Sequence, residues 1–293
     1  HVHTAFWHST ILRQFSKRGL FGDSLNEMSW AINQVIDTLK STGEAENTLV
    51  LFTSDHGPHK EICTFGGETA GLKGGKSNFW EGAYRVPGIA WMPGTIPAGV
   101  LSDTVLTALD LLPTFVSLAT GPGMVSPLDV NDIALDGIDV TEHLMGQTLD
   151  TDHEITTIRP IFYFCEKRLM AVRYKDWKIH YNTIPLFPVD GKDLEMCPGG
   201  IPLEDWFVAQ QCPDDAIFVH DPPLVYNLDV DPYENYAVNT TDPEVKEVLA
   251  IVAEKVAAHT ASVKEVPDLM GDFSDDVVPC NGEYPDNCLL NYP

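Results

Sequence analysis

The chain has 293 residues, 44% of them apolar, which is enough for one large core or for two unequal domains. Its 43 acidic residues outnumber 18 basic ones, so the formal net charge is −25. This balance argues against a nucleic-acid partner, because no excess of Lys and Arg is present to displace phosphate counterions. An anionic substrate would have to be attracted by local cations or by a metal ion. No run of about 18 apolar residues exists, so the sequence predicts no membrane-spanning helix.

The first predicted element is a helix that begins at a capping box of Ser24 and Glu27 and ends at Gly43. Residues 48–54 follow as a continuous apolar and β-branched run, which is typical of a strand buried on both faces of a parallel sheet. Asp55-His56-Gly57 comes at the carboxyl end of that strand, and open α/β sheets bind ligands at this end. The apolar face predicted for the helix consists of Leu25, Met28, Ala31, Ile32, Val35, Ile36 and Leu39.

The middle of the chain predicts a loop and two further elements. Residues 71–85 are rich in Gly, Lys and aromatic side chains and predict an ordered loop. Residues 87–91 predict a strand, and residues 105–118 predict a short helix that is interrupted or started at Pro113. Residues 1–155 are therefore interpreted as the end of a large α/β domain.

From about residue 160 the pattern changes to short strands joined by tight turns, which predicts an antiparallel meander. A final helix is capped by Asp242, with Pro243 at its first position. Residues 156–293 are expected to form a smaller α+β domain with an antiparallel sheet and a terminal helix. The predicted strands are 161–165, 169–174, 177–181 and 224–228, and the apolar face of the helix is Val245, Val248, Leu249, Val252 and Val256.

The cysteines and a sequon bear on the compartment. None of the six cysteines lies in a Cys-x-x-Cys pair, which argues against a zinc knuckle. An even number, with five in the loop-rich second half, suits disulfides formed in an oxidising compartment. Asn239-Thr240-Thr241 is a glycosylation sequon in a turn-like stretch. We therefore expect a secreted or luminal protein.

Four features could carry chemistry, although each also has a plain structural explanation. They are His1-Val2-His3, Asp55-His56, Gly75-Lys76 and Arg85. A lone His-x-His is more often structural, Asp and Gly favour turns, and the glycine loop lacks the full phosphate-binding motif. The arginine could pair with a buried carboxylate.

Together, these features describe one kind of site. Asp55 and His56 supply ligands for a divalent cation. Lys76, held in a glycine loop, supplies a point charge for a tetrahedral oxyanion. His3 could protonate a leaving alkoxide, because an imidazole titrates near neutrality. A metal, a lysine and a histidine are equipped to hydrolyse a sulfate or a phosphate ester, and this chemistry fits either ester.

The order of motifs resembles the type I sulfatases, a family that includes arylsulfatases and steryl sulfatase. The resemblance covers nearly the whole chain and includes a specific block, GGKSNFWEGAYRVPG. The other matching segments, in order, are HVHTA, FGDSLNEM, TLVLFTSDHG, LDLLPT, LDGIDVTEHLMG, AVRYKDWKIHY, HDPPLVYNLDVDPYEN and HTASVKEVPD.

The resemblance implies an alkaline-phosphatase-like fold, with a mixed sheet flanked by helices and a smaller subdomain built on an antiparallel sheet. It also implies a Ca²⁺ ion beside a formylglycine made from a cysteine. Asp55 matches a calcium-binding Asp, and His56 takes the neighbouring position, where arylsulfatases have Gln or Asn and iduronate sulfatase has His. Lys76 matches the sulfate-binding Lys, and His3 matches the His that assists the leaving group. The implied disulfides are Cys165 with Cys212 and Cys280 with Cys288, while Cys63 and Cys197 stay unassigned.

One departure from the family pattern is that none of the cysteines lies in the Cys-x-Pro-x-Arg context that yields formylglycine. We therefore expect the chain to be the C-terminal part of a longer protein, whose upstream segment supplies the nucleophile and the other calcium ligands. The expected partners are a sulfate ester and that upstream segment. Two alternatives are a catalytically silent extracellular binding or structural protein, and a phosphodiesterase or phosphonate hydrolase of the same superfamily.

Overall fold

A computed structural model describes residues 16–121, 135–146, 159–184, 212 and 214–264. The chain forms two compact units, His1–Val252 and Ala253–Pro293. In the second unit the described residues are the last turns of one helix and two residues beyond it. No helix of the described ranges is long and apolar enough to cross a membrane. The predicted division of the chain between residues 155 and 156 stays a prediction.

Helix α1 (Gly19–Thr42) begins before the predicted capping box. Ser24 lies inside the helix, where its hydroxyl donates to the carbonyl of Leu20 (2.9 Å), so the capping-box prediction is wrong. The chain instead enters the helix through a turn in which the Asp23 carboxylate accepts the N–H of Ser16 (3.0 Å). The helix ends as predicted at Gly43, whose φ of 77° suits a residue without a side chain.

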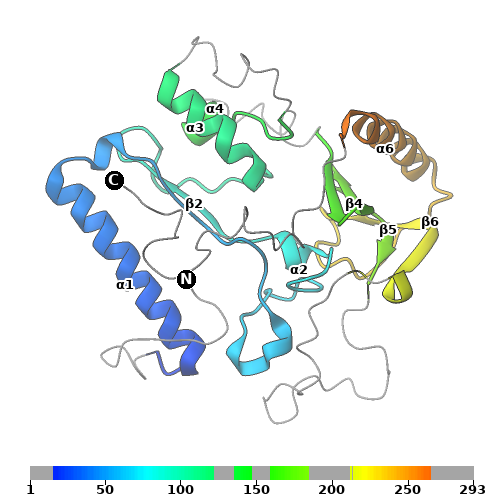
Figure 1. The fold of residues 1–293 in the computed structure, drawn as a ribbon, viewed down its shortest axis with the longest axis horizontal. Coiled ribbons are helices and arrows are strands. Elements are labelled where there is room, and N and C mark those ends of the chain that lie inside the picture. The colour runs from blue at the N-terminus through cyan, green and yellow to red at the C-terminus, as the bar shows by residue number, and fades with distance from the viewer. Residues whose placement is uncertain (1–15, 122–134, 147–158, 185–211, 213, 265–293) are drawn as a thin grey trace, which may run out of the picture. The chain divides into compact units, whose positions relative to one another are not determined.

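Strands β1 (Val50–Thr53) and β2 (Gly88–Trp91) pair in antiparallel register, with Val50 opposite Trp91 and Thr53 opposite Gly88 (Figure 1). The prediction of a strand buried in a parallel sheet is wrong for this pair. Both strands are partly exposed, and a continuous apolar run indicates burial without fixing the direction of its neighbour. The short helical elements of this region are η1 (Ala45–Asn47), η2 (Lys60–Phe65), α2 (Glu81–Tyr84), η3 (Ala108–Asp110), α3 (Leu111–Thr120) and α4 (Thr141–Leu144).

The predicted meander is confirmed as a four-stranded antiparallel sheet in the order β3-β4-β5-β6 (Figure 1). Its strands are β3 (Ile161–Cys165), β4 (Arg168–Tyr174), β5 (Trp177–Thr183) and β6 (Phe218–Asn227). β6 begins earlier than predicted, since Phe218 and Val219 also pair with β5. The register shifts between these residues and Leu224, in the stretch that contains Pro222 and Pro223. Proline has no N–H to donate and is tolerated at such an irregularity on an edge strand.

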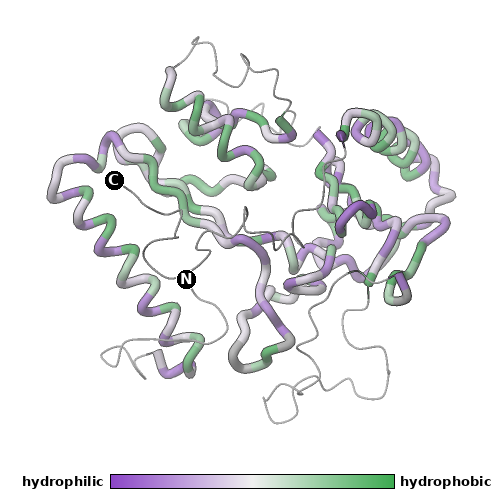
Figure 2. The backbone as a smooth tube through the Cα atoms, in the orientation of Figure 1, coloured by the Kyte–Doolittle hydropathy of each residue, from purple (hydrophilic) through white to green (hydrophobic). Residues whose placement is uncertain are grey.

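The core of this sheet includes residues from the loop that precedes α2. Phe79 packs with Tyr163 and Met170, and Trp80 packs with Tyr226. Figure 2 shows the hydrophobic stretches along these strands and the alternation of hydrophobic and hydrophilic residues along α1. The glycine-rich loop is therefore anchored in the core of the C-terminal sheet.

Helix α6 (Pro243–Ser262) begins as predicted. The Asp242 carboxylate accepts the N–H of Glu244 (3.0 Å), which caps the helix. Two members of the predicted apolar face, Val245 and Val252, are buried.

Candidate functional site

Asp55 and His56 follow directly after β1 and present two ligand atoms on the same side. The distance from Asp55 Oδ2 to His56 Nε2 is 3.5 Å, and the two side chains are 75% and 37% exposed. His56 Nδ1 lies 2.7 Å from the carbonyl oxygen of Gly57. Because a carbonyl can only accept, Nδ1 carries the proton and Nε2 of the neutral ring keeps its lone pair.

This geometry fits a divalent cation. Two ligands at right angles around a cation at about 2.3–2.6 Å lie about 3.3–3.7 Å apart, which matches the Asp55–His56 distance. A carboxylate suits Ca²⁺, and an imidazole whose other nitrogen donates to a carbonyl is in the tautomer that a metal requires. Within the described ranges, however, no group of three or more His, Cys, Asp or Glu side chains could hold a metal ion.

Backbone hydrogen bonds place the glycine-rich loop beside this pair. The N–H of Gly57 donates to the carbonyl of Ala83 (2.7 Å), and the N–H of Lys76 donates to the carbonyl of Pro58 (2.9 Å). The contact is close: a Cβ on Gly57 would lie 1.9 Å from the oxygen of Gly82. The structure therefore brings the predicted residues Asp55, His56 and Lys76 into one region.

Lys76 lies at the tip of a short closed loop. The N–H of Gly82 donates to the carbonyl of Lys73 (2.8 Å) and closes the base. Inside the loop, the side-chain oxygen of Asn78 accepts the N–H groups of Gly75 (3.4 Å) and Trp80 (3.3 Å). In the part of the chain that the structure describes, the Lys76 ammonium makes no hydrogen bond or ion pair. This cation is available to an oxyanion.

A buried cluster of charged side chains, which the sequence did not predict, joins the end of the loop to the C-terminal sheet. Glu81 Oε1 accepts from Lys178 Nζ (2.9 Å), and Glu81 Oε2 accepts from Arg173 (3.2 Å). Glu234 Oε1 accepts from His180 Nε2 (2.7 Å). Glu81 is 2% exposed, and Lys178, His180 and Glu234 are fully buried. The strand alternation of WKIHY places Lys178 and His180 on one face, but a polar face normally predicts exposure to water.

Two pKa values in the cluster are shifted. Burial raises the pKa of Glu81, but the charges of Lys178 and Arg173 outweigh burial, so this pKa lies below its ordinary value. Burial lowers the pKa of His180, although the hydrogen bond to Glu234 opposes the shift. His180 is therefore neutral at pH 7 and donates through Nε2. Its Nδ1 has no hydrogen-bond partner among the described residues.

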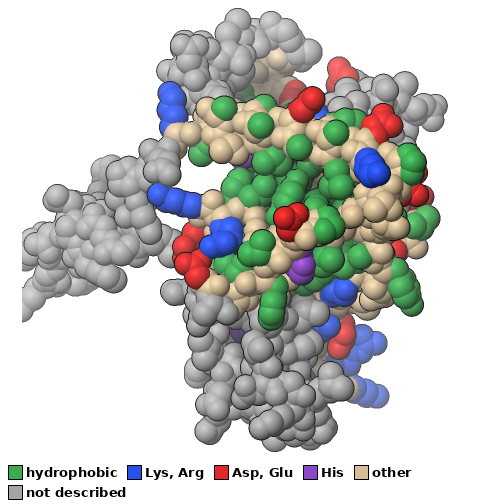
Figure 3. Space-filling view, turned by 90° about the vertical axis from the view of Figure 1, so that its right-hand side faces the viewer, with side chains coloured by type: hydrophobic (Ala, Val, Ile, Leu, Met, Phe, Trp, Pro, Cys, Tyr) green, Lys and Arg blue, Asp and Glu red, His purple; other side chains and the backbone are tan. Residues whose placement is uncertain are grey.

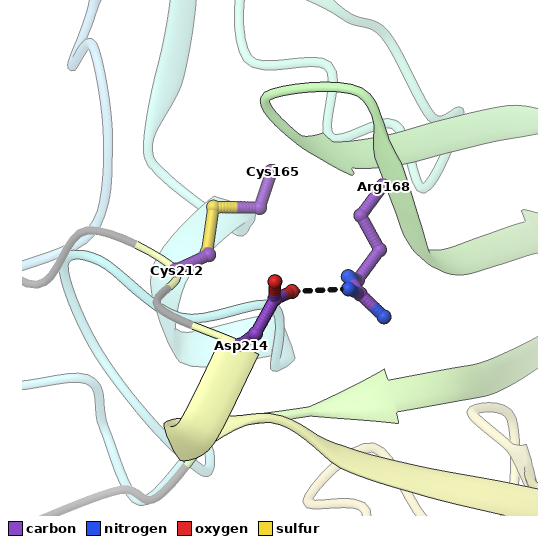
Figure 4. The surroundings of a disulfide bond; sticks show 4 residues. All are labelled: Cys165, Arg168, Cys212 and Asp214. Atoms are coloured by element: carbon purple, nitrogen blue, oxygen red, sulfur yellow. Dashed lines mark hydrogen bonds and ion pairs between the residues drawn. A yellow bond between two sulfur atoms is a disulfide. The ribbon is translucent and has the colours of Figure 1, made fainter.

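The predicted disulfide between Cys165 and Cys212 is confirmed, with Cα atoms 6.2 Å apart (Figure 4). An ion pair between Arg168 and Asp214 lies beside it. Cys63 is disulfide-bonded as well, to a residue outside the described ranges. The predicted pair Cys280–Cys288 lies outside the described residues, as do His1, His3 and Cys197.

The predicted glycosylation site is an exposed turn. The side-chain oxygen of Asn239 accepts the N–H of Thr241 (3.0 Å) and its hydroxyl (2.9 Å). The carbonyl of Asn239 also accepts the N–H of Asp242 (3.1 Å), at the start of α6. Asn239 is exposed, and these contacts of its side chain use the oxygen and not the amide nitrogen.

Comparisons with known proteins identify the family. The sulfatase family pattern matches residues 4–122, and the pattern described as the C-terminal region of aryl-sulfatase matches residues 156–290. The chain belongs to the type I sulfatase family. It is 35% identical to an arylsulfatase of Hemicentrotus pulcherrimus over 292 residues, which cover 100% of this chain and 50% of that protein. It is 34% identical to human steryl-sulfatase over 282 residues, which cover 92% of this chain and 44% of that protein.

The chain thus spans about half the length of the curated relatives it matches. Its fold is that of the sulfatases, with their alkaline-phosphatase-like architecture. The sulfatase PsFucS1 from Pseudoalteromonas sp. superposes with a TM-score of 0.69 at 23% identity, over 90% of this chain and 48% of that one. The predicted family and fold class are therefore confirmed.

Proposed function

We propose that the protein containing this chain hydrolyses sulfate esters, with Asp55 and His56 as calcium ligands and Lys76 as the group that binds the sulfate. The observation that carries this proposal is the pair of backbone hydrogen bonds from Gly57 to Ala83 and from Lys76 to Pro58. They hold the backbone of Lys76 beside the segment that carries Asp55 and His56, and the Lys76 ammonium has no hydrogen bond or ion pair among the described residues. Membership of the sulfatase family favours sulfate over phosphate as the esterified group.

Each described side chain has a defined task in this proposal. The Lys76 ammonium neutralises part of the charge on the sulfate oxygens and orients the ester. The Asp55 carboxylate and the His56 Nε2 lone pair would hold Ca²⁺, which when bound supplies positive charge at the same oxygens. His3, outside the described residues, is proposed to protonate the leaving alkoxide.

The nucleophile and the remaining ligands are proposed to come from an upstream segment of the same protein, with the nucleophile as a formylglycine. Calcium takes six to eight ligands, of which Asp55 and His56 supply two. Apolar side chains in the same unit are also uncovered: Trp30 and Val35 on α1 are 55% and 54% exposed, and Ile89 on β2 is 60% exposed. A helix and a strand of a sulfatase sheet would bury these side chains against further elements of the domain.

The covalent chemistry supports a proposal for the compartment. We place the protein in a secretory compartment or outside the cell, because disulfides such as Cys165–Cys212 persist in oxidising surroundings. The exposed turn at Asn239 is an accessible acceptor for a glycan in the same compartment.

The test is hydrolysis of a chromogenic aryl sulfate and the matching aryl phosphate by the intact natural protein, with and without a calcium chelator. Selective turnover of the sulfate, suppressed by the chelator and restored by added Ca²⁺, supports the proposal. Lys76→Met should abolish sulfate turnover, and Lys246→Met, which changes an exposed lysine on α6, should not. Folded protein that turns over neither ester would point to a silent binding protein, and preference for the phosphate would point to a phosphoesterase.

A further inference from the structure

Both ends of the loop that carries Lys76 are held by one residue far along the chain. At the start of the loop, the Lys73 ammonium donates to the backbone carbonyl of Glu234. At its end, the N–H of Glu81 donates to the carboxylate oxygen Oε2 of Glu234 (2.6 Å). The sequence separations are 161 and 153 residues. Glu234 therefore closes the loop from outside, in addition to the bond from Gly82 to Lys73 within it.

Glu234 is itself held rigidly. It is fully buried, with Oε1 bound to His180 Nε2 (2.7 Å) and Lys178 Nζ 3.7 Å away. Both partners lie on β5, a strand that pairs on both sides within the described sheet. Glu234 thus connects the loop to strand β5 of the sheet.

The loop gains from such support, because two consecutive glycines precede Lys76. Gly74 has a φ of 79°, and Gly75 follows it directly before Lys76, so the backbone there has the freedom of glycine. The ring of Trp80 strengthens the hold at the start of the loop, since the Lys73 ammonium lies 4.3 Å from its centroid. The burial of Phe79 and Trp80 fixes the C-terminal half of the loop. In the half before Lys76, the Lys73 side chain adds a contact with the C-terminal sheet to the hydrogen bonds made by the loop backbone.

We infer that Glu234 and Lys73 are positioning residues for sulfate binding: by holding both ends of the 73–81 loop on the C-terminal sheet, they fix Lys76 beside the Asp55–Pro58 segment. Neither residue touches the sulfate. The position of Lys76, and with it the sulfate-binding site, therefore depends on a contact from the C-terminal half of the chain. The inference rests on the proposed role of Lys76, and it adds a task for the antiparallel sheet.

The contacts of Lys73 and Glu234 with the two ends of the loop are called the clamp. The experiment uses the full-length natural protein with three substitutions in the clamp and one outside it. Lys73→Met keeps the aliphatic stem but removes the hydrogen bond and the charge above Trp80. Lys73→Arg keeps a cationic donor, and Glu234→Gln removes the carboxylate without changing the side-chain volume. The matched control is Arg159→Met, which breaks a different buried ion pair, with Asp110, that does not contact the loop.

The first measurement is the inhibition constant of inorganic sulfate, together with KM and kcat for an aryl sulfate. Loss of one hydrogen bond that orders the loop should raise the sulfate inhibition constant and KM of Lys73→Met about five- to tenfold. Lys73→Arg should restore both constants to near the natural values. Arg159→Met should lower the melting temperature without changing either constant. Equal constants for Lys73→Met and the natural protein would overturn the inference, as would equal effects of Lys73→Met and Arg159→Met.

The second measurement does not depend on activity. Backbone hydrogen exchange in peptides covering residues 73–83 should speed up in Lys73→Met and Glu234→Gln but not in Arg159→Met. Unchanged exchange in both clamp variants would overturn the clamp, whatever the protein catalyses. Faster exchange in a protein that neither binds sulfate nor hydrolyses sulfate esters would keep the clamp, reject the proposed function and, with it, the role in sulfate binding.

Discussion

Glu81 and Lys178 form an ion pair in which the oxygen and nitrogen are 2.9 Å apart and the side chains are 2% and 0% exposed. Arg173 binds the second oxygen of Glu81, so the carboxylate has a partner on each side. The pair joins helix α2, at the end of the Lys76 loop, to strand β5 of the C-terminal sheet. Removing one member of a buried ion pair is destabilising, because the remaining charge stays away from water and loses a partner.

We expect Lys178→Met to destabilise the protein by about 3 kcal/mol, the lower end for a broken buried pair, because Glu81 would lose one of its two cationic partners and keep Arg173. The double substitution Lys178→Met with Glu81→Gln should recover part of this loss. Unfolding in urea, followed by fluorescence, measures both. Arg168→Ala is the control, since its ion pair with the 89% exposed Asp214 should contribute less than about 1 kcal/mol. A loss for Lys178→Met as small as that of the control would contradict the prediction.

The buried His180 predicts a dependence of stability on pH. Its pKa lies below 6.5, mainly because of burial. As the pH falls below that value, the unfolded chain binds a proton that the folded chain does not, so the free energy of unfolding should fall. His180→Asn keeps a donor for Glu234 but cannot titrate, and it should show a smaller fall between about pH 7 and pH 5.5. Urea unfolding of both proteins at the two values measures this difference, and parallel falls would show that His180 is not responsible.

Glu81 acts in a lower pH range. Its pKa is lowered from 4.5, so its stabilising effect is complete above about 4.5 and is lost as the pH falls through the lowered value. The two groups therefore destabilise the acidified protein one after the other, His180 first.

The local elements were the most predictable part of this fold. Periodicity and turn chemistry predict the meander, the cap at Asp242 and the strand before Asp55, and the structure contains all three. The direction of the β1–β2 pair was not predictable, because the apolar run of residues 50–53 has the same composition in a parallel or an antiparallel sheet. The start of α1 was missed because Ser24 bonds back to Leu20 within the helix instead of capping it.

The sequence placed Asp55 and His56 directly after a strand and Lys76 in a glycine-rich loop, and the structure agrees with both positions; their roles stay predictions. The supporting cluster was not predictable, because its members lie far apart in sequence and charged residues normally stay exposed. Glu234 has the same local pattern as an exposed residue of a turn, and its long-range contacts with Glu81 and Lys73 are visible only in the structure.

The disulfide between Cys165 and Cys212 closes a separation of 47 residues. Chain entropy predicts that a loop of this length stabilises the folded state by about 4 kcal/mol. We therefore expect Cys165→Ser with Cys212→Ser to lower the free energy of unfolding by about this amount while the meander persists. Urea unfolding and circular dichroism measure the two properties. A double variant as stable as the natural protein would contradict the prediction.

The sequon at Asn239 should carry a glycan in protein made by its natural host. Digestion with a peptide N-glycosidase should lower the apparent mass and convert Asn239 to Asp, which peptide mass mapping detects. Thr241→Ala should abolish modification, because it removes the hydroxyl that donates to the Asn239 side chain. Thr241→Ser, which keeps this hydroxyl, is the control. An unmodified Asn239 peptide from secreted protein would rule out the site.

The exposed apolar side chains of the C-terminal part give a reference for neutral changes. Figure 3 shows one face of the molecule, on which hydrophobic side chains gather among acidic and basic ones. Val230 is 77% exposed and Tyr236 is 79% exposed, so each makes few contacts within the described chain. Val230→Ala should leave both stability and sulfate affinity unchanged, which makes it a second control for the variants of the loop.

Asp55→Asn should weaken calcium binding without weakening the fold, because the Asp55 side chain is 75% exposed and carries no packing role. Calcium should raise the melting temperature of the natural full-length protein by mass action, and the substitution should reduce the calcium affinity about tenfold or more by removing a ligand charge. His56→Gln should reduce it less, because an amide oxygen can still coordinate. Thermal unfolding at increasing calcium concentrations measures all three proteins. Asp229→Asn, which neutralises another exposed carboxylate, is the control. An equal shift in all four proteins would place the calcium elsewhere and leave Asp55 as an ordinary turn residue after β1.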